Sequence, residues 1–250
     1  MSSGEGIVLV LIAALLIAGV VYWQLVVAEG AYLGTRVVSL LYDWFAPRYD
    51  RVKQYDKTAD AIMLAQPVMR HLTTPHPHGP SESHLPLSRR ERGEGNVLDV
   101  GTGTGRMPDA LLSQARFKGH VVAIDASVRM LDLAREKLAR HASRITFMQR
   151  DAQSLPFEDA SFDVVTCLEV LEFMGDGRGA LREMVRVLKP GGLLMVSNRI
   201  GSDAWKLPGR ALKTGDFVTW LSEIGVSDAR SQAWLVDYDL VIGTKAFLTE

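Results

Sequence analysis

The sequence predicts an α/β fold in which helices cover both faces of a mainly parallel sheet, preceded by one apolar helix. From Asn96 onward, short apolar runs alternate with segments of helical periodicity, and a glycine-rich turn follows the first run. This alternation is typical of strand-helix-strand units. We expect four parts: residues 1–30 as a transmembrane anchor, 31–72 as a helical lid or membrane-proximal segment, 73–95 as a Pro-rich flexible insert, and 96–250 as a ligand-binding domain.

The composition excludes several classes of protein. The 28 Lys and Arg residues nearly balance the 29 Asp and Glu residues, for a formal net charge of −1. Because no general basic field results, we expect no nucleic-acid partner. The only cysteine, Cys167, cannot form an intramolecular disulfide or a cysteine metal cluster. A reducing compartment is consistent with this composition.

The apolar helix is predicted over residues 7–28, which contain no charged side chain. At 1.5 Å per residue such a helix is about 33 Å long, enough to cross the hydrocarbon layer of a membrane. Tyr22 and Trp23 near its end suit the headgroup boundary. A cleavable secretory signal is the alternative, but the run is longer than the apolar part of a signal. Arg36 and Arg48 follow the span, which predicts a single-pass protein with its catalytic domain on the cytoplasmic side.

The segment between the anchor and the domain divides into helices and a linker. Residues 31–72 show two helical patterns, the first ending at Pro47 and the second running from about Arg51 to Leu72. Residues 73–95 are rich in proline, glycine and serine and are expected to form a flexible insert. Three of the six histidines lie there without acidic or cysteine partners, so we predict a linker rather than a metal site.

Seven strands and four helices are expected after this insert. The last two strands are joined by only a few residues around Asp237, and should therefore be antiparallel. Ser127 and Thr214 are expected to cap the helices that follow them. The expected strands are 97–100, 121–124, 145–148, 162–168, 193–197, 229–236 and 239–244, and the expected helices are 107–115, 127–141, 180–188 and 216–224.

The glycine-rich turn is the segment with the strongest chemical signal. Gly101, Gly103 and Gly105 alternate directly after a buried strand, which lets the backbone turn sharply and expose amide groups to a ligand. In a dinucleotide fingerprint, G-x-G-x-x-G, the third glycine would stand where this chain has Arg106. The spacing therefore argues against a pyrophosphate, although not against another anionic group.

Three acidic residues follow the strand pattern. Asp99 lies in the first strand, Asp125 ends the second, and Asp151 follows the third. In a parallel sheet these positions meet at one edge, where carboxylates can accept hydrogen bonds from an ammonium, a ribose diol and an exocyclic amine. Each could instead cap a turn or helix. A ligand that carries all three groups is S-adenosylmethionine.

Five motifs resemble, in order and spacing, the class I S-adenosylmethionine-dependent methyltransferases over residues 96–245. They are Leu98 to Gly105, Ala123-Ile124-Asp125, Arg150-Asp151-Ala152, Phe162-Asp163-Val164-Val165 and Leu188 to Gly192. The resemblance implies a Rossmann-like seven-stranded sheet with the last strand antiparallel, and S-adenosyl-L-methionine as the cofactor.

The same resemblance implies roles for individual residues. The glycine turn with Thr102 would cradle the methionine part, and Asp99 would orient it from beneath. Asp125 with Ala126 would bind the ribose. The implied adenine site is Asp151 with Ala152, and Glu169 would face the cofactor.

Two shorter resemblances concern the acceptor side. The stretch from Cys167 to Phe173 is similar to quinone-pathway O-methyltransferases, which have a metal-binding His where this chain has Phe173, so no metal site is predicted. The stretch ending in Tyr49-Asp50 resembles the start of ubiquinone/menaquinone C-methyltransferases and phospholipid N-methyltransferases, in which a Tyr-Asp pair lies over the cofactor. The alternative is an amphipathic helix with interfacial aromatics that lies on the membrane.

These expectations combine into a membrane-anchored methyltransferase. Its acceptor would be small and lipophilic, either a quinone precursor or a phospholipid headgroup. Methyl transfer from a sulfonium mainly needs alignment, but a base would help some acceptors, and Glu169, Tyr49 and His141 are the candidates. A soluble acceptor, a non-catalytic cofactor-binding membrane protein and an NAD-dependent oxidoreductase remain as alternatives.

Overall fold

The computed structural model describes residues 3–74 and 94–247, in which seven strands form one sheet. The strand order is β3-β2-β1-β4-β5-β7-β6, so the predicted α/β fold is confirmed. The strands are β1 Asn96–Val100, β2 His120–Asp125, β3 Ile145–Gln149, β4 Phe162–Cys167, β5 Leu188–Arg199, β6 Val226–Leu235 and β7 Tyr238–Lys245.

The sheet is mixed, and its order reverses at one point. Strands β1 to β5 are parallel, whereas β7 runs antiparallel to both β5 and β6, as expected for the final hairpin. From β1 the chain proceeds to β2 and β3 on one side, and then returns to β4 on the other side. In such sheets the connections diverge at the reversal, which opens a crevice at the carboxyl ends of the strands.

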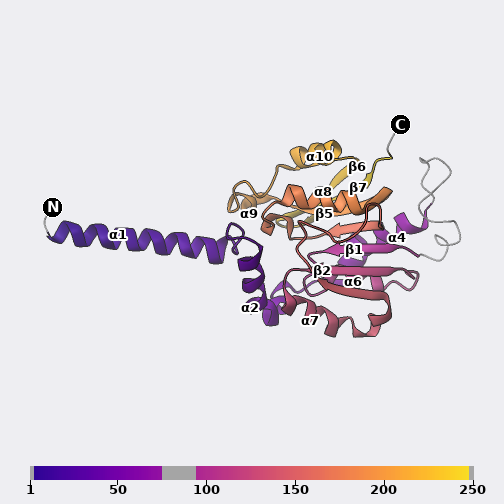
Figure 1. The fold of residues 1–250 in the computed structure, drawn as a ribbon, viewed down its shortest axis with the longest axis horizontal. Helices are drawn as coiled ribbons and strands as arrows, with labels where there is room; N and C mark the ends of the chain where they lie inside the picture. Colours follow the sequence, from indigo (N-terminus) through magenta and orange to yellow (C-terminus); the bar gives the residue numbers. More distant parts are fainter. Residues whose placement is uncertain (1–2, 75–93, 248–250) are drawn as a thin grey trace.

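Helices cover both faces of the sheet (Figure 1). The helices and helical turns of the domain are α6 Arg106–Leu112, α7 Val128–Lys137, η3 Ala139–Arg144, η4 Leu171–Phe173, α8 Gly177–Val187, α9 Gly201–Trp205 and α10 Thr214–Glu223. Neighbouring strand residues point to opposite faces. Leu98 accordingly belongs to the apolar core shared with α8 and α10, and Val97 to the core shared with α6.

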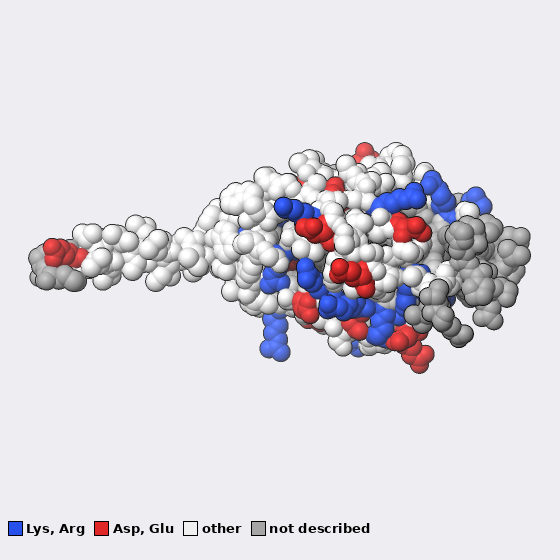
Figure 2. Space-filling model, turned by 90° about the horizontal axis from the view of Figure 1, so that it is seen from above, with Lys and Arg blue, Asp and Glu red and all other residues white. Residues whose placement is uncertain are grey.

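The N-terminal helix projects from one end of this body (Figure 1). It consists of α1, Ser3–Tyr22, continued by the π-helical turn η1, Trp23–Val27. Residues 5–27 are long and apolar enough to cross a membrane, and none of this stretch is buried against the protein. A signal sequence near an N-terminus passes the same test. Figure 2 shows the helix as uncharged apart from its acidic tip, in contrast to the mixed charges of the body.

The next helix, α2, differs from the expectation. It runs unbroken over Thr35–Lys53 and contains Pro47, so the predicted end at Pro47 was wrong. Proline removes one backbone hydrogen bond, but contacts of α2 with the domain on both sides of Pro47 hold the helix together. The helix ends instead at Gln54, which adopts a left-handed conformation with φ 43°.

The second predicted helix, 51–72, is present but starts later, at Lys57, and is continuous to Thr73 with a π-helical turn inside it. Its parts are α3 Lys57–Asp60, the π-helical turn η2 Ala61–Ala65 and α4 Gln66–Thr73. Asp56 caps α3 by accepting from the backbone amides of Thr58 and Ala59. Most of the predicted insert 73–95 lies outside the described residues.

Two local predictions in the domain were also wrong. Strand β5 begins at Leu188 and continues through the Pro-Gly-Gly break, with an irregular pairing to β4 that absorbs it. Lys213 rather than Thr214 occupies the cap of α10, because the Thr214 hydroxyl donates to Asp239 instead. The predicted cap at Ser127 is confirmed, since its hydroxyl accepts from the amide of Met130.

Candidate functional site

The glycine turn forms the floor of a pocket at the carboxyl ends of β1, β2 and β4. Gly101, Gly103 and Gly105 all have positive φ angles, of 69°, 52° and 81°. A Cβ at Gly101 would lie 2.6 Å from Val170, and one at Gly105 would lie 2.8 Å from Leu138. A Cβ at Gly103 would meet nothing within 4 Å. The outer two glycines therefore allow tight packing, and the middle one leaves open space over the turn.

Asp125, the last residue of β2, holds this turn. Its carboxylate accepts a 2.8 Å hydrogen bond from the amide of Gly103 and another of 2.8 Å from the amide of Ser127. Burial raises the pKa of Asp125, while these amides lower it. The amide of Ala126 also lowers the pKa of Asp125 through a hydrogen bond. Since a carboxylate has about four acceptor positions, one remains for a hydroxyl group of a ligand. Asp125 and the adjacent Ala126 both line the pocket.

Asp99 lies beneath the turn. It is 2% exposed and accepts a 2.6 Å hydrogen bond from the hydroxyl of Thr166 on the neighbouring strand β4. Burial raises its pKa to about 6, although the hydrogen bond from Thr166 opposes this shift. Asp99 and Thr102 line a small hollow under the turn, and Gly101 and Gly103 border both this hollow and the main pocket.

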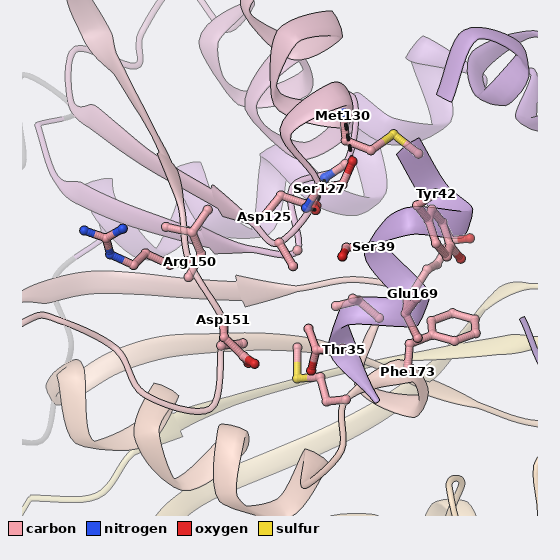
Figure 3. A pocket seen from close by; sticks show the side chains of 18 of the residues that line it. Thr35, Ser39, Tyr42, Asp125, Ser127, Met130, Arg150, Asp151, Glu169 and Phe173 are labelled. Atoms are coloured by element: carbon pink, nitrogen blue, oxygen red, sulfur yellow. Dashed lines mark hydrogen bonds between the residues drawn. The ribbon is translucent and has the colours of Figure 1, made fainter. Parts of the chain in front are cut away.

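Asp151 and Ala152 line the pocket on its other side, in the loop after β3. Figure 3 shows the side chains of Asp125 and Asp151 on different sides of the cavity, with Arg150 directed away from it. Asp151 is exposed and accepts from the backbone amide of Gln153 at 3.0 Å. The structure thus brings all three predicted acids to one edge of the sheet, two in the main pocket and one below it.

Glu169, after β4, lies between two cations. Its carboxylate pairs with Arg106 at 2.6 Å and with Lys53 at 2.7 Å, and its side chain is 7% exposed. Its backbone has a positive φ of 58°. Arg106 also pairs with the buried Asp60 at 2.6 Å. Glu169 reaches the pocket, but its charge is already balanced by these neighbours.

Helix α2 closes the pocket from above, and this was only partly foreseen. Tyr49 lines the pocket as the resemblance implied, together with Thr35, Val38, Ser39 and Tyr42 of the same helix. Burial raises the pKa of Tyr49 well above its ordinary value, so its hydroxyl stays protonated at neutral pH. The periodicity of residues 31–45 shows an amphipathic helix, but nothing in it tells which face would cover a pocket.

Asp50 does not line the main pocket but fastens α2 to the domain. Its carboxylate accepts from the hydroxyl of Thr104 at 2.5 Å and pairs with Lys137 at 2.5 Å. One to two turns earlier, Asp43 accepts from the hydroxyl of Ser127, also at 2.5 Å. Sequence analysis missed Asp43 and Lys137, because their partners are far away along the chain.

His141 and Cys167 lie away from the pocket lining. His141 belongs to η3, which directly precedes β3 and so lies toward the opposite edge of the sheet from the carboxyl ends. Burial and two neighbouring arginines, Arg140 and Arg144, lower its pKa. Cys167 is fully buried in the core, and burial raises its pKa well above the ordinary value. Among the described residues, no cluster of three His, Cys, Asp or Glu side chains is arranged to hold a metal ion.

The pocket and its floor fit a nucleoside with a charged tail. The cavity is open to solvent at its mouth and is lined by residues of the sheet edge and of α2. The open space over Gly103, the remaining acceptor capacity of Asp125 and the buried carboxylate of Asp99 are compatible with a methionine part, a ribose and an ammonium group.

Comparisons with known proteins agree with this geometry. Residues 98–196 match the family described as a methyltransferase domain. Over 102 residues the chain is 40% identical to the ubiquinone/menaquinone biosynthesis C-methyltransferase UbiE of Vibrio vulnificus, covering 40% of this chain and 39% of that protein. It is 42% identical over 100 residues to the demethylmenaquinone methyltransferase of Clavibacter sepedonicus, again covering 40% and 39%. The similarity thus spans about two fifths of each relative.

Solved structures show the same fold. A SAM-dependent methyltransferase from Aquifex aeolicus has a TM-score of 0.53 at 20% identity, with 77% of this chain and all of that chain covered. The 4+2 cyclase SpnF has a TM-score of 0.63 at 19% identity, with 85% and 96% covered. At these identities the likeness concerns the fold alone.

The fold and the edge of its sheet define a Rossmann-like nucleoside-binding domain. Residues 98–196 form a methyltransferase domain, and the proteins that this domain matches imply S-adenosylmethionine as its cofactor.

Proposed function

We propose that this protein is a membrane-anchored methyltransferase that transfers the methyl group of S-adenosylmethionine to a small lipophilic acceptor, a quinone precursor or a phospholipid headgroup. The observation that carries the proposal is the position of the pocket relative to the apolar helix. Thr35, which lines the pocket, follows the last residue of the candidate span, Val27, by only eight residues. An acceptor dissolved in the membrane is therefore held close to the site, as tethering raises the local concentration without new contacts.

The cofactor is assigned to the pocket as the sequence motifs implied. The turn of Gly101, Thr102, Gly103 and Gly105 holds the methionine part, and Asp99 orients it from below. Asp125 and Ala126 bind the ribose, and Asp151 and Ala152 the adenine. Two features support this assignment: the middle glycine leaves space above the turn, and Asp125 keeps acceptor capacity for a ligand while it holds the turn.

The residues of the pocket contribute mainly alignment and exclusion of water. When bound, the cofactor supplies an activated methyl group on a sulfonium, which an acceptor attacks in line. Helix α2 covers the reacting atoms with Tyr42 and Tyr49, which limits the access of water. Glu169 is already engaged in ion pairs with Arg106 and Lys53. We assign Glu169 and Tyr49 to positioning rather than to proton abstraction, and His141 to neither.

The relatives support an acceptor of the quinone type. The relative from Vibrio vulnificus is a C-methyltransferase of ubiquinone/menaquinone biosynthesis, and the relative from Clavibacter sepedonicus is a demethylmenaquinone methyltransferase. These names describe whole proteins, of which the aligned region is about two fifths. A quinone ring precursor has an acidic carbon or hydroxyl at which methylation is possible without a strong base.

The test is methyl transfer to membrane extracts. The full chain in lipid nanodiscs is incubated with isotopically labelled S-adenosylmethionine and either total membrane lipid or the water-soluble extract of the same cells. We expect label in a lipid-extractable product. Label confined to water-soluble molecules would contradict the lipophilic acceptor, and a protein that binds S-adenosylhomocysteine but labels neither extract would contradict the enzymatic function.

A further inference from the structure

The outer face of α2 combines exposed apolar side chains with arginines. Leu40 and Trp44 lie one helical turn apart and are 66% and 72% exposed. At 100° per residue, Arg36, Arg48 and Arg51 fall on the same side of the helix. All three are exposed, and Arg48 stacks over the ring of Trp44 at 5.8 Å.

The charges of α2 are sorted between its two faces. Asp43 and Asp50 contact the domain through Ser127 and Lys137, and Lys53 pairs with Glu169. Within the described chain, no ion pair joins an acidic side chain to the three arginines of the outer face. The inner face therefore uses its charges to hold the domain, and the outer face presents positive charge together with apolar surface.

Two further exposed apolar side chains lie at the same end of the sheet. Trp205 ends α9 and is 72% exposed, and Val236, in the turn between β6 and β7, is 93% exposed. The amide of Ile200, just before α9, donates to the carbonyl of Asp237 in that turn. This turn follows the carboxyl end of β6, and α9 follows the carboxyl end of β5, so both segments lie at the same end of the sheet. We call Arg36, Leu40, Trp44, Arg48, Arg51, Trp205 and Val236 the edge surface.

The edge surface is continuous with the end of the apolar helix. Trp23 of η1 stacks on Tyr32 at 5.4 Å, and the hydroxyl of Tyr32 donates to the carbonyl of Pro208, shortly after α9. Arg210 donates to the carbonyl of Ala31 at 2.7 Å. The segment between the span and α2 is thereby fixed to the loop after α9. In Figure 1, α2 and α9 both lie at the end of the body from which α1 projects.

We propose that the edge surface lies on the headgroup layer of the membrane and that its arginines bind anionic lipids. The inference rests on the proposed membrane span and adds to it a second contact that fixes the orientation of the domain. Exposed tryptophans suit the headgroup boundary, and each arginine near an anionic surface strengthens binding by about fivefold. The first turn of α2 carries Thr35 and Val38 of the pocket lining. A domain held in this way opens its pocket toward the bilayer.

The experiment measures the depth of single labelled cysteines in the full chain. The natural Cys167 is buried and stays unlabelled. Leu40→Cys and Val236→Cys place an environment-sensitive dye on the edge surface. The control is Lys118→Cys, on an exposed residue shortly before β2 and hence at the opposite edge of the sheet. The proteins are inserted into nanodiscs of phosphatidylcholine, with or without phosphatidylserine, that carry a lipid-bound quencher.

We expect at least threefold stronger quenching at residues 40 and 236 than at residue 118, with a further increase when phosphatidylserine is present. Arg36→Gln combined with Arg48→Gln should abolish that increase, whereas Arg116→Gln, at an exposed position near the control label, should not. Equal quenching at all three labels would overturn the proposal. Quenching of the dyes by one another, between two copies of the chain, without quenching by the lipid-bound quencher would also overturn it. If the protein inserts but the dyes at residues 40 and 236 are not quenched, only the docking is refuted. If the protein does not insert, the proposed span is refuted as well.

Discussion

The pocket has two walls that are held in different ways. The floor is formed by the sheet edge, where backbone amides of the glycine turn bond to Ile124 and Asp125 within one α/β unit. The roof is α2, which is held by side-chain contacts between Asp43, Asp50 and Lys53 and distant parts of the domain. The floor is therefore rigid and set by local sequence, whereas the roof depends on contacts that can open.

This difference suggests a division of labour. A cofactor needs a preformed site, and the floor supplies it with few adjustable side chains. An acceptor must enter and leave, and a roof held mainly by partly exposed ion pairs is easier to displace than a strand of the sheet. Variants of the floor should accordingly change the affinity for the cofactor, and variants of the roof should change the rate at which a ligand is released.

The largest expected effect is at Arg106, which joins the floor of the pocket to α3. Arg106 begins α6 directly after the glycine turn and pairs with Asp60 and Glu169, all nearly buried. Arg106→Met leaves the buried carboxylate of Asp60 without a counter-charge and Glu169 with Lys53 alone, so we expect the free energy of unfolding to fall by about 3–5 kcal/mol. Urea unfolding followed by circular dichroism measures this. Arg116→Met, at an exposed arginine, is the control, and equal stability of both variants would contradict the network.

The next effect concerns cofactor affinity at the floor. Asp125→Asn replaces a carboxylate with an amide that cannot accept from the backbone amides and from a ribose hydroxyl together. Since a hydrogen bond to a charged group contributes about 1.5–3 kcal/mol, the loss of one should lower the affinity for S-adenosylhomocysteine about 10- to 150-fold. Calorimetric titration measures this. A change below threefold in a folded variant would show that Asp125 serves only to hold the turn.

The pH dependence of cofactor binding reports on Asp99. Because its pKa is raised to about 6, the carboxylate is charged above pH 6 and protonated below it. Affinity for the ammonium of S-adenosylhomocysteine should therefore be constant above about pH 7 and fall by about tenfold per pH unit well below pH 6. Asp99→Asn should bind weakly with no such dependence. A wild-type affinity that is unchanged between pH 5 and pH 8 would contradict the role of Asp99.

The smallest effect is expected at the roof. Asp50→Asn removes the charge that pairs with Lys137, a pair that is partly exposed to solvent. Such pairs contribute up to about 1 kcal/mol, so we expect about a fivefold faster release of S-adenosylhomocysteine in stopped-flow measurements and little loss of stability. Asp132→Asn removes an ion pair within α7 and should leave release unchanged. If the two variants behave alike, α2 does not gate the pocket.

The same contrast explains what the sequence could predict. The strands, the glycine turn and the convergence of Asp99, Asp125 and Asp151 follow from local patterns, because a parallel sheet brings successive strand ends to one edge. The path of α2 does not follow from them. Pro47 predicts a helix end, yet the contacts of Asp43 and Asp50 stabilise the helix on both sides. Such pairs join residues far apart in the chain, and no spacing rule relates them.

The most direct test of the central claim is an equilibrium titration of the full chain with two ligands. If the glycine turn and the three carboxylates form a site for S-adenosylmethionine, the protein should bind S-adenosylhomocysteine with a 1:1 stoichiometry and show no binding of NAD. Binding of NAD, or no binding of S-adenosylhomocysteine by a folded protein, would contradict the account.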